Sequence, residues 1–175
     1  MEVIGSNPIS PTIEKTTPTG VVFSIYHSIT WLTWYIFRYD RAEIVKKVKA
    51  LGFPRGSFVV FGSGPLALAG IREANDVDML ITPELYAKLE LEGWQKISKG
   101  LGDEPLIQGD IEVHPNWDFS SYKPSLKDLL SRAKYVDGVA FASIADVRKW
   151  KVDHDHPNRE EVLRQIDTYL REYLG

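Results

Sequence analysis

The sequence predicts one domain of the α/β (α+β) class, and three observations lead to that prediction. Short apolar runs bounded by turn residues alternate along the chain with segments whose apolar residues recur at helical spacing. The chain has 175 residues, of which 43% are hydrophobic, and this suits one domain with a substantial core. Cysteine is absent, which excludes disulfides and thiolate metal sites and fits a reducing, cytoplasmic setting. Any metal must therefore bind oxygen or histidine.

The charge balance narrows the classes of partner. A formal net charge of -3 gives no basic excess of the kind that duplex-binding modules carry, so no strong nucleic-acid interaction is predicted. A partner protein is compatible with this composition.

Residues 1–38 differ in composition from the rest and are predicted to be a poorly structured N-terminal arm ahead of a domain over 39–175. Residues 1–20 are rich in Pro, Ser, Thr and Gly. The uncharged, aromatic run at 21–37 is slightly short for a membrane span and contains polar residues, so a packed or amphipathic segment is favoured. The peptide IGSNPI at 4–9 resembles a translated T-arm of a transfer RNA, which raises the hypothesis that the assigned start lies upstream of the natural one.

The elements of the domain can be assigned in order from cap and turn signals. Asp40 is a helix N-cap, and the apolar residues after it recur at helical spacing as far as Leu51. Ser125 and Ser143 each precede an aspartate by three residues, as in a capping box, and begin two further helices. In chain order, the predicted elements are a helix at 40–51, a strand at 58–61, a helix at 64–71, a strand at 76–81, a helix at 82–91, a strand centred on 111–113, helices from 125 and 143, and a last helix from 155–157.

Two aspartates, Asp76 and Asp78, stand one residue apart in a predicted strand that is otherwise apolar. Strand residues two apart point to the same face, with backbones about 7 Å apart. Like charges so close are costly unless a cation lies between them, and Mg²⁺ is the natural candidate because it prefers carboxylate oxygens. The alternative is an exposed strand end whose aspartates lie in water or pair with Arg72.

A glycine-serine turn follows the preceding strand. Backbone amides at Gly62, together with the hydroxyl of Ser63, form a turn of the kind that binds anions ahead of a helix. Arg72 lies between this turn and the aspartates in the sequence, and is a further candidate phosphate contact. An anion-binding turn beside a dication site predicts a site for a nucleoside triphosphate with its metal.

The run Phe61-Gly62-Ser63, twelve further residues, and then Asp76-Val77-Asp78-Met79 resemble the signature of the polymerase beta-type nucleotidyltransferase superfamily in its small, minimal form. The resemblance covers roughly residues 41–170. It implies a mixed sheet of about four to five strands flanked by helices, with further helices at the C-terminus. It also implies a third acid on the next strand, which Glu112 supplies between two apolar residues. Asp110 shares the face of Glu112 by strand alternation and is the fallback for that role.

In the mechanism that the resemblance implies, Asp76 and Asp78 hold one or two Mg²⁺ ions against the triphosphate. Glu112 completes the metal site and, with Asp78, helps an acceptor hydroxyl to attack the α-phosphorus. Gly62 and Ser63 hold the departing phosphates. The donor is a nucleoside triphosphate, ATP by default, the acceptor is unidentified, and pyrophosphate is released.

The C-terminal part is similar to small members of this superfamily and then departs from them. Residues 139–151 read as a short strand and a helix ending in lysine, which makes Lys151 a candidate substrate contact. Asp110 is a second candidate substrate contact. The Lys-Asp pair that usually follows in those members is missing from 153–166. This loss keeps open a second hypothesis, a catalytically silent domain that binds or regulates a partner, as an antitoxin does. A third is an ordinary α/β domain whose acids are incidental.

Two other sets of residues have both a structural and a functional interpretation. His154 and His156, with the aspartates beside them, fit a loop and helix cap better than a transition-metal site. Trp117 follows Glu112 closely and could stack on a base, but packing in the core is favoured.

Overall fold

The computed structural model describes residues 38–174, apart from 101, 118–120 and 155–157, and these residues all belong to one compact unit. The N-terminal arm, its aromatic run and the peptide that resembles a transfer-RNA sequence lie outside the described residues. The predicted start of the last helix, at 155–157, does so too. Within the described part of the chain, no helix combines the length and the apolar character that a membrane span needs.

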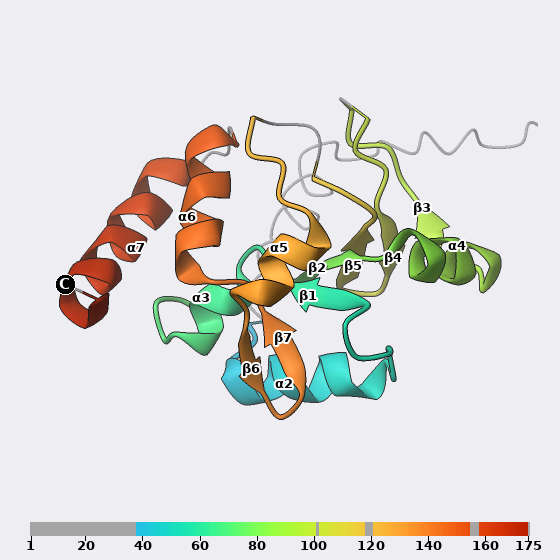
Figure 1. Ribbon diagram of the computed structural model, residues 1–175, viewed down its shortest axis with the longest axis horizontal. Coiled ribbons are helices and arrows are strands. Elements are labelled where there is room, and N and C mark those ends of the chain that lie inside the picture. Colours follow the sequence, from blue (N-terminus) through green and yellow to red (C-terminus); the bar gives the residue numbers. More distant parts are fainter. Residues whose placement is uncertain (1–37, 101, 118–120, 155–157, 175) are drawn as a thin grey trace, which may run out of the picture. The chain divides into compact units, whose positions relative to one another are not determined.

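A mixed sheet forms the centre of the domain and, in the described residues, contains seven strands in the order β3-β4-β5-β2-β1-β7-β6 (Figure 1). β2 runs parallel to β5 and β1 runs parallel to β7, while the other neighbouring pairs are antiparallel. Helices flank the sheet, which confirms the predicted class. The strands are β1 Phe58–Val60, β2 Val77–Ile81, β3 Gln95–Lys96, β4 Leu106–Gln108, β5 Ile111–His114, β6 Lys134–Val136 and β7 Val139–Phe141.

The expectation of about four to five strands was too low, and the extra strands are short ones. β3, β4 and β6 have only two or three residues each, too few to show a clear alternation of apolar and polar residues. The segment 105–113 was expected to contain one strand but forms most of the hairpin of β4 and β5. Gly109, with a φ of 63°, takes the left-handed conformation that such a tight turn requires.

The predicted caps begin the helices. Asp40 accepts hydrogen bonds from main-chain N–H groups at the start of α2, and Thr82, Ser125 and Ser143 do the same for α4, α5 and α6. α3 ends earlier than predicted, because Gly70 turns the chain with a φ of 72°. The helices are α2 Arg41–Ala50, α3 Gly64–Leu68, α4 Pro83–Leu91, α5 Leu126–Ser131, α6 Ile144–Asp153 and α7 Arg159–Leu174.

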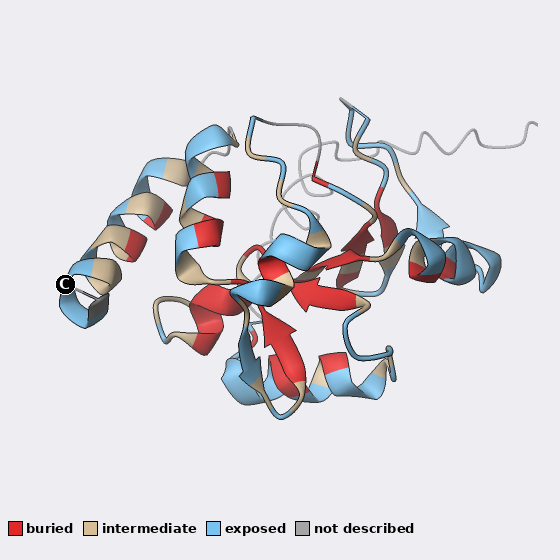
Figure 2. Cartoon of the chain, in the orientation of Figure 1, coloured by how far each residue is buried: buried red, intermediate tan, exposed pale blue. Residues whose placement is uncertain are grey.

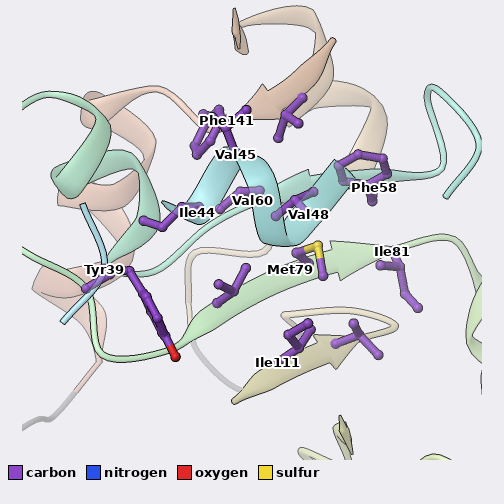
Figure 3. Close-up of a cluster of buried hydrophobic side chains, with 14 of the residues drawn as sticks. Tyr39, Ile44, Val45, Val48, Phe58, Val60, Met79, Ile81, Ile111 and Phe141 are labelled. Carbon is purple, nitrogen blue, oxygen red and sulfur yellow. The ribbon is translucent and has the colours of Figure 1, made fainter. Parts of the chain in front are cut away.

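The sheet separates two hydrophobic cores. On one face, α2 packs its buried residues Ile44, Val45 and Val48 against the strands (Figure 3). On the other face, buried residues of α5, α6 and α7 cover the strands. The central strands are therefore buried while the helices keep polar outer faces (Figure 2). Because Val77 and Met79 belong to the α2 core, Asp78 between them points to the opposite face.

A buried carboxylate fixes the start of α6. Asp146 is only 1% exposed and accepts two hydrogen bonds from the guanidinium of Arg132, at 2.9 and 3.1 Å. It also accepts hydrogen bonds from the hydroxyls of Ser143 at 2.6 Å and Tyr122 at 2.5 Å. Burial alone would raise the pKa of Asp146, but these partners outweigh it and lower the pKa below its usual range.

We expect Asp146→Asn to lower the free energy of unfolding by about 2 kcal/mol at pH 7, because it leaves buried hydrogen-bonding groups imperfectly paired. A carboxyl group with a lowered pKa in the folded state stabilises the fold above its unfolded pKa of about 3.9, and this stabilisation is lost as the pH falls. Urea unfolding at pH 7 and at pH 3 should therefore show a smaller difference from wild type at the lower pH.

Asp128 offers a matched control, because it also stands three residues after a capping serine but is exposed. Asp128→Asn should cost less stability than Asp146→Asn. Equal losses in the two variants would contradict the assigned role of burial.

Candidate active site

The register of three strands brings the predicted motifs together. β1 is antiparallel to β2, with Val60 opposite Met79, so the end of β1 lies beside the start of β2. The main-chain N–H of Phe61 donates to the carbonyl oxygen of Asp78 at 2.8 Å. β2 is parallel to β5, with Asp78 directly opposite Glu112. Both carboxylates therefore point to the same face of the sheet.

Gly62 touches one of these carboxylates so closely that no larger residue fits. Its φ is 60°, in the left-handed region, and a Cβ atom at this position would lie 2.1 Å from Oδ2 of Asp78. The glycine of the turn is thus required both by the backbone conformation and by the approach of Asp78.

Ser63 contacts the remaining predicted acid, Asp76, which lies just before β2. The hydroxyl of Ser63 donates to Oδ1 of Asp76 at 3.3 Å, and Ser63 makes no side-chain cap on the five-residue α3. This hydroxyl therefore faces the acids. Burial, and then the charge of Glu112, raises the pKa of Asp76 above its usual range.

Charged residues that the sequence did not single out complete the site. Nζ of Lys99 lies 2.5 Å from Oε1 of Glu112, and Nε2 of His114 lies 2.7 Å from the same oxygen. Nδ1 of His114 lies 2.9 Å from Oδ1 of Asp103. His114 stands two residues after Glu112 on the same strand face, which was visible in the sequence, whereas Lys99 and Asp103 come from the connection between β3 and β4 and carried no signal.

The pKa values describe a crowded acidic site with cations of its own. Burial, and then the charges of Asp76 and Glu112, raises the pKa of Asp78 to about 7. Burial would lower the pKa of His114, but Asp103 and Glu112 outweigh it and raise that pKa to about 9. His114 is therefore an imidazolium at neutral pH, held between two carboxylates.

A further cation, Lys151, lies near the acids. Lys151, at the last turn of α6, is partly buried, and its ammonium stands 4.6 Å from the centre of the Trp150 ring. Burial lowers the pKa of Lys151, the charge of Asp78 opposes this, and the charge of Arg72 adds to it. Lys151 thus lies within electrostatic reach of Asp76 and Asp78, and the charge of Arg72 acts on Lys151.

Asp110 does not join the site. Its carboxylate forms an ion pair with Lys47 of α2, with an N–O distance of 2.9 Å, and α2 covers the opposite face of the sheet. The expected alternation with Glu112 fails because Asp110 lies in the tight turn before β5 and not in the strand. Asp110 therefore lies with α2 and apart from the other three acids.

Trp117 and His154, the other residues with a possible functional role, pack against neighbouring side chains. Trp117 is 3% exposed and stacks on His114, with ring centres 4.4 Å apart, so it packs in the core. His154 stacks on Trp150, and Asp153 accepts a hydrogen bond from the main-chain N–H of Tyr122 at 2.5 Å. Residues 155–157, with His156, lie outside the described residues.

The donor atoms suit a hard divalent cation. Among the described residues, one side-chain atom from each of Asp78, Glu112 and His114 lies within 4.8 Å of the other two, but His114 as an imidazolium offers no lone pair, so the carboxylates are the donors. Carboxylate oxygens are the ligands that Mg²⁺ prefers, and Asp76 adds another beside them. Comparisons with models of known families, with curated proteins and with solved structures found no match to this chain. What the site does is therefore inferred from its own residues.

We expect Gly62→Ala to disturb the site more than Gly70→Ala. Both glycines have a positive φ, so each substitution costs about 1–2 kcal/mol of backbone strain. At Gly70 nothing lies within 4 Å of the new methyl group, whereas at Gly62 the methyl group collides with Asp78. Urea unfolding should show a clearly larger loss for Gly62→Ala, and equal losses would contradict the close approach.

Proposed function

We propose that this protein is a magnesium-dependent nucleotidyltransferase, which moves a nucleoside monophosphate from a nucleoside triphosphate to a hydroxyl acceptor. The observation that carries the proposal is the register of β1, β2 and β5. It places the turn at Gly62 and Ser63, which would bind phosphate, beside the carboxylates of Asp78 and Glu112, and the hydroxyl of Ser63 donates to Asp76 next to them. This combination serves phosphoryl chemistry better than it serves a purely structural role.

Asp76, Asp78 and Glu112 would hold one or two Mg²⁺ ions. When bound, the metal supplies positive charge that neutralises the triphosphate and favours the attack of the acceptor oxygen. The carboxylates also orient the acceptor hydroxyl, and Glu112 with Asp78 takes up its proton as the new bond to the α-phosphorus forms. The bond from the α-phosphorus to the bridging oxygen breaks, and pyrophosphate leaves.

The departing phosphates would meet the turn after β1. The turn lies directly against Asp78 at Gly62, and the hydroxyl of Ser63 donates to Asp76, so phosphates at this turn would lie beside the acids that hold the metal. The charge of Lys151, which Asp76 and Asp78 influence, and the neighbouring charge of Arg72 would balance the charge that develops on pyrophosphate.

A second candidate, a catalytically silent binding or regulatory partner, is favoured by one specific contact. Lys99 and His114 already place two cations on the same oxygen of Glu112. In a silent domain these cations would replace the metal permanently, and the surface around the acids would serve a partner protein. The loss of the Lys-Asp pair after Lys151 agrees with this candidate.

The test is the transfer of label from each α-labelled nucleoside triphosphate, with Mg²⁺, into RNA, protein and small molecules of a cell extract. We expect wild type to transfer label and Asp78→Asn to lose about a hundredfold or more of that activity. Asp110→Asn is the matched control, because Asp110 is an aspartate at a neighbouring strand start that pairs with Lys47 outside the site.

No transfer by wild type, together with nucleotide binding either with or without Mg²⁺, would replace the enzyme by the silent partner. The absence of both transfer and binding would remove nucleotides from the function altogether. A loss of activity in Asp110→Asn as large as in Asp78→Asn would contradict the assigned site.

A further inference from the structure

One acid of the candidate site, Glu112, is in contact with a lysine that reaches it from the surface. Nζ of Lys99 lies 2.5 Å from Oε1 of Glu112, and the side chain of Lys99 is 44% exposed while that of Glu112 is 12% exposed. The charge of Lys99 also acts on Asp76 and Asp78, where it opposes the effect of burial on the pKa of each. The ammonium of Lys99 therefore contacts Glu112 directly and acts on Asp76 and Asp78 only through its charge.

The other cation at Glu112 is held in a different way. His114 is buried, stacked on Trp117, and paired through its second nitrogen with Asp103. Its ring cannot leave without disrupting the core on that face of the sheet. Lys99, in contrast, has a long flexible stem and needs only a change of side-chain rotamer to leave Glu112.

We propose that Lys99 is the resident counter-cation of the three acids, that a divalent cation must displace it from Glu112, and that Lys99 thereby sets the metal affinity of the site. An ammonium at this place neutralises the carboxylates as a metal would, and its repulsion opposes the entry of a second cation. The inference rests on the proposed function only in taking these acids as the metal ligands.

The chain supplies a close control for this role. Lys96, three residues earlier, forms an ion pair with Glu90 at 2.5 Å and its side chain is 41% exposed. Lys96 and Lys99 thus match in residue type, exposure and ion-pair distance, but Glu90 is not part of the site. Any general effect of removing one lysine charge on metal binding or stability should therefore appear in variants of both lysines.

The experiment compares wild type with Lys99→Met and Lys96→Met, without nucleotide, by calorimetric titration with Mg²⁺ and with Mn²⁺. We expect Lys99→Met to bind the metal at least about tenfold more tightly than wild type, and Lys96→Met to bind it as wild type does. Lys99→Arg keeps the positive charge, so its metal affinity should stay at or below the wild-type value. Equal or weaker binding by Lys99→Met would overturn the proposal.

Thermal unfolding supplies a second readout that does not depend on catalysis. Without divalent cations, Lys99→Met should unfold at a lower temperature than Lys96→Met, because its acids lack their counter-cation. Addition of Mg²⁺ or Mn²⁺ should raise the midpoint of Lys99→Met more than that of wild type. A metal-induced shift that is equal in the two proteins would also overturn the proposal.

The same measurements separate this inference from the proposed function. Tighter metal binding by Lys99→Met with no label transfer by wild type would support the counter-cation and contradict the enzyme. Label transfer by wild type with equal metal binding in all variants would support the enzyme and overturn the counter-cation. If none of the variants binds a divalent cation, the counter-cation is wrong, and label transfer alone decides the enzyme.

Discussion

The candidate site depends on the main-chain pairing of β2, which lies between the antiparallel strand β1 and the parallel strand β5. The antiparallel partner β1 brings its end, with Gly62 and Ser63, to the start of β2. The parallel partner β5 places Glu112 opposite Asp78. A slip of one residue would turn these side chains into the hydrophobic core under α2, so the packing of that core maintains the register.

Electrostatics imposes the second constraint. Carboxylates that are close together and partly buried repel one another, and the chain offsets this repulsion with cations of its own. His114 is a buried cation that orders Glu112, while Lys99 is a surface cation on the same oxygen. The difference in burial between the two cations decides which of them can give way to a metal.

The enzyme and the silent partner share this scaffold. Both need the acids gathered at one place, and both use the helices α5, α6 and α7 on that face of the sheet. The buried carboxylate of Asp146 fixes the start of α6, and the last turn of α6 carries Lys151 toward the acids. The enzyme and the silent partner differ in whether a metal ion replaces Lys99 at Glu112. An exchangeable lysine makes the acids a metal site, whereas a permanent one makes them part of a charged surface.

The sequence by itself determined what depends on neighbours along the chain: the helix caps, the alternation that turns Asp78 away from Val77 and Met79, and the glycine turn before it. The strand was predicted to begin at Asp76, but it begins at Val77, so Asp76 lies in the bend before it. It also predicted Glu112 as the third acid. Only the tertiary structure decided that Lys99 reaches Glu112, that Asp110 pairs with α2, and that short edge strands extend the sheet. Those contacts join residues far apart in the chain, and they form only when strand pairing and core packing have brought their elements together.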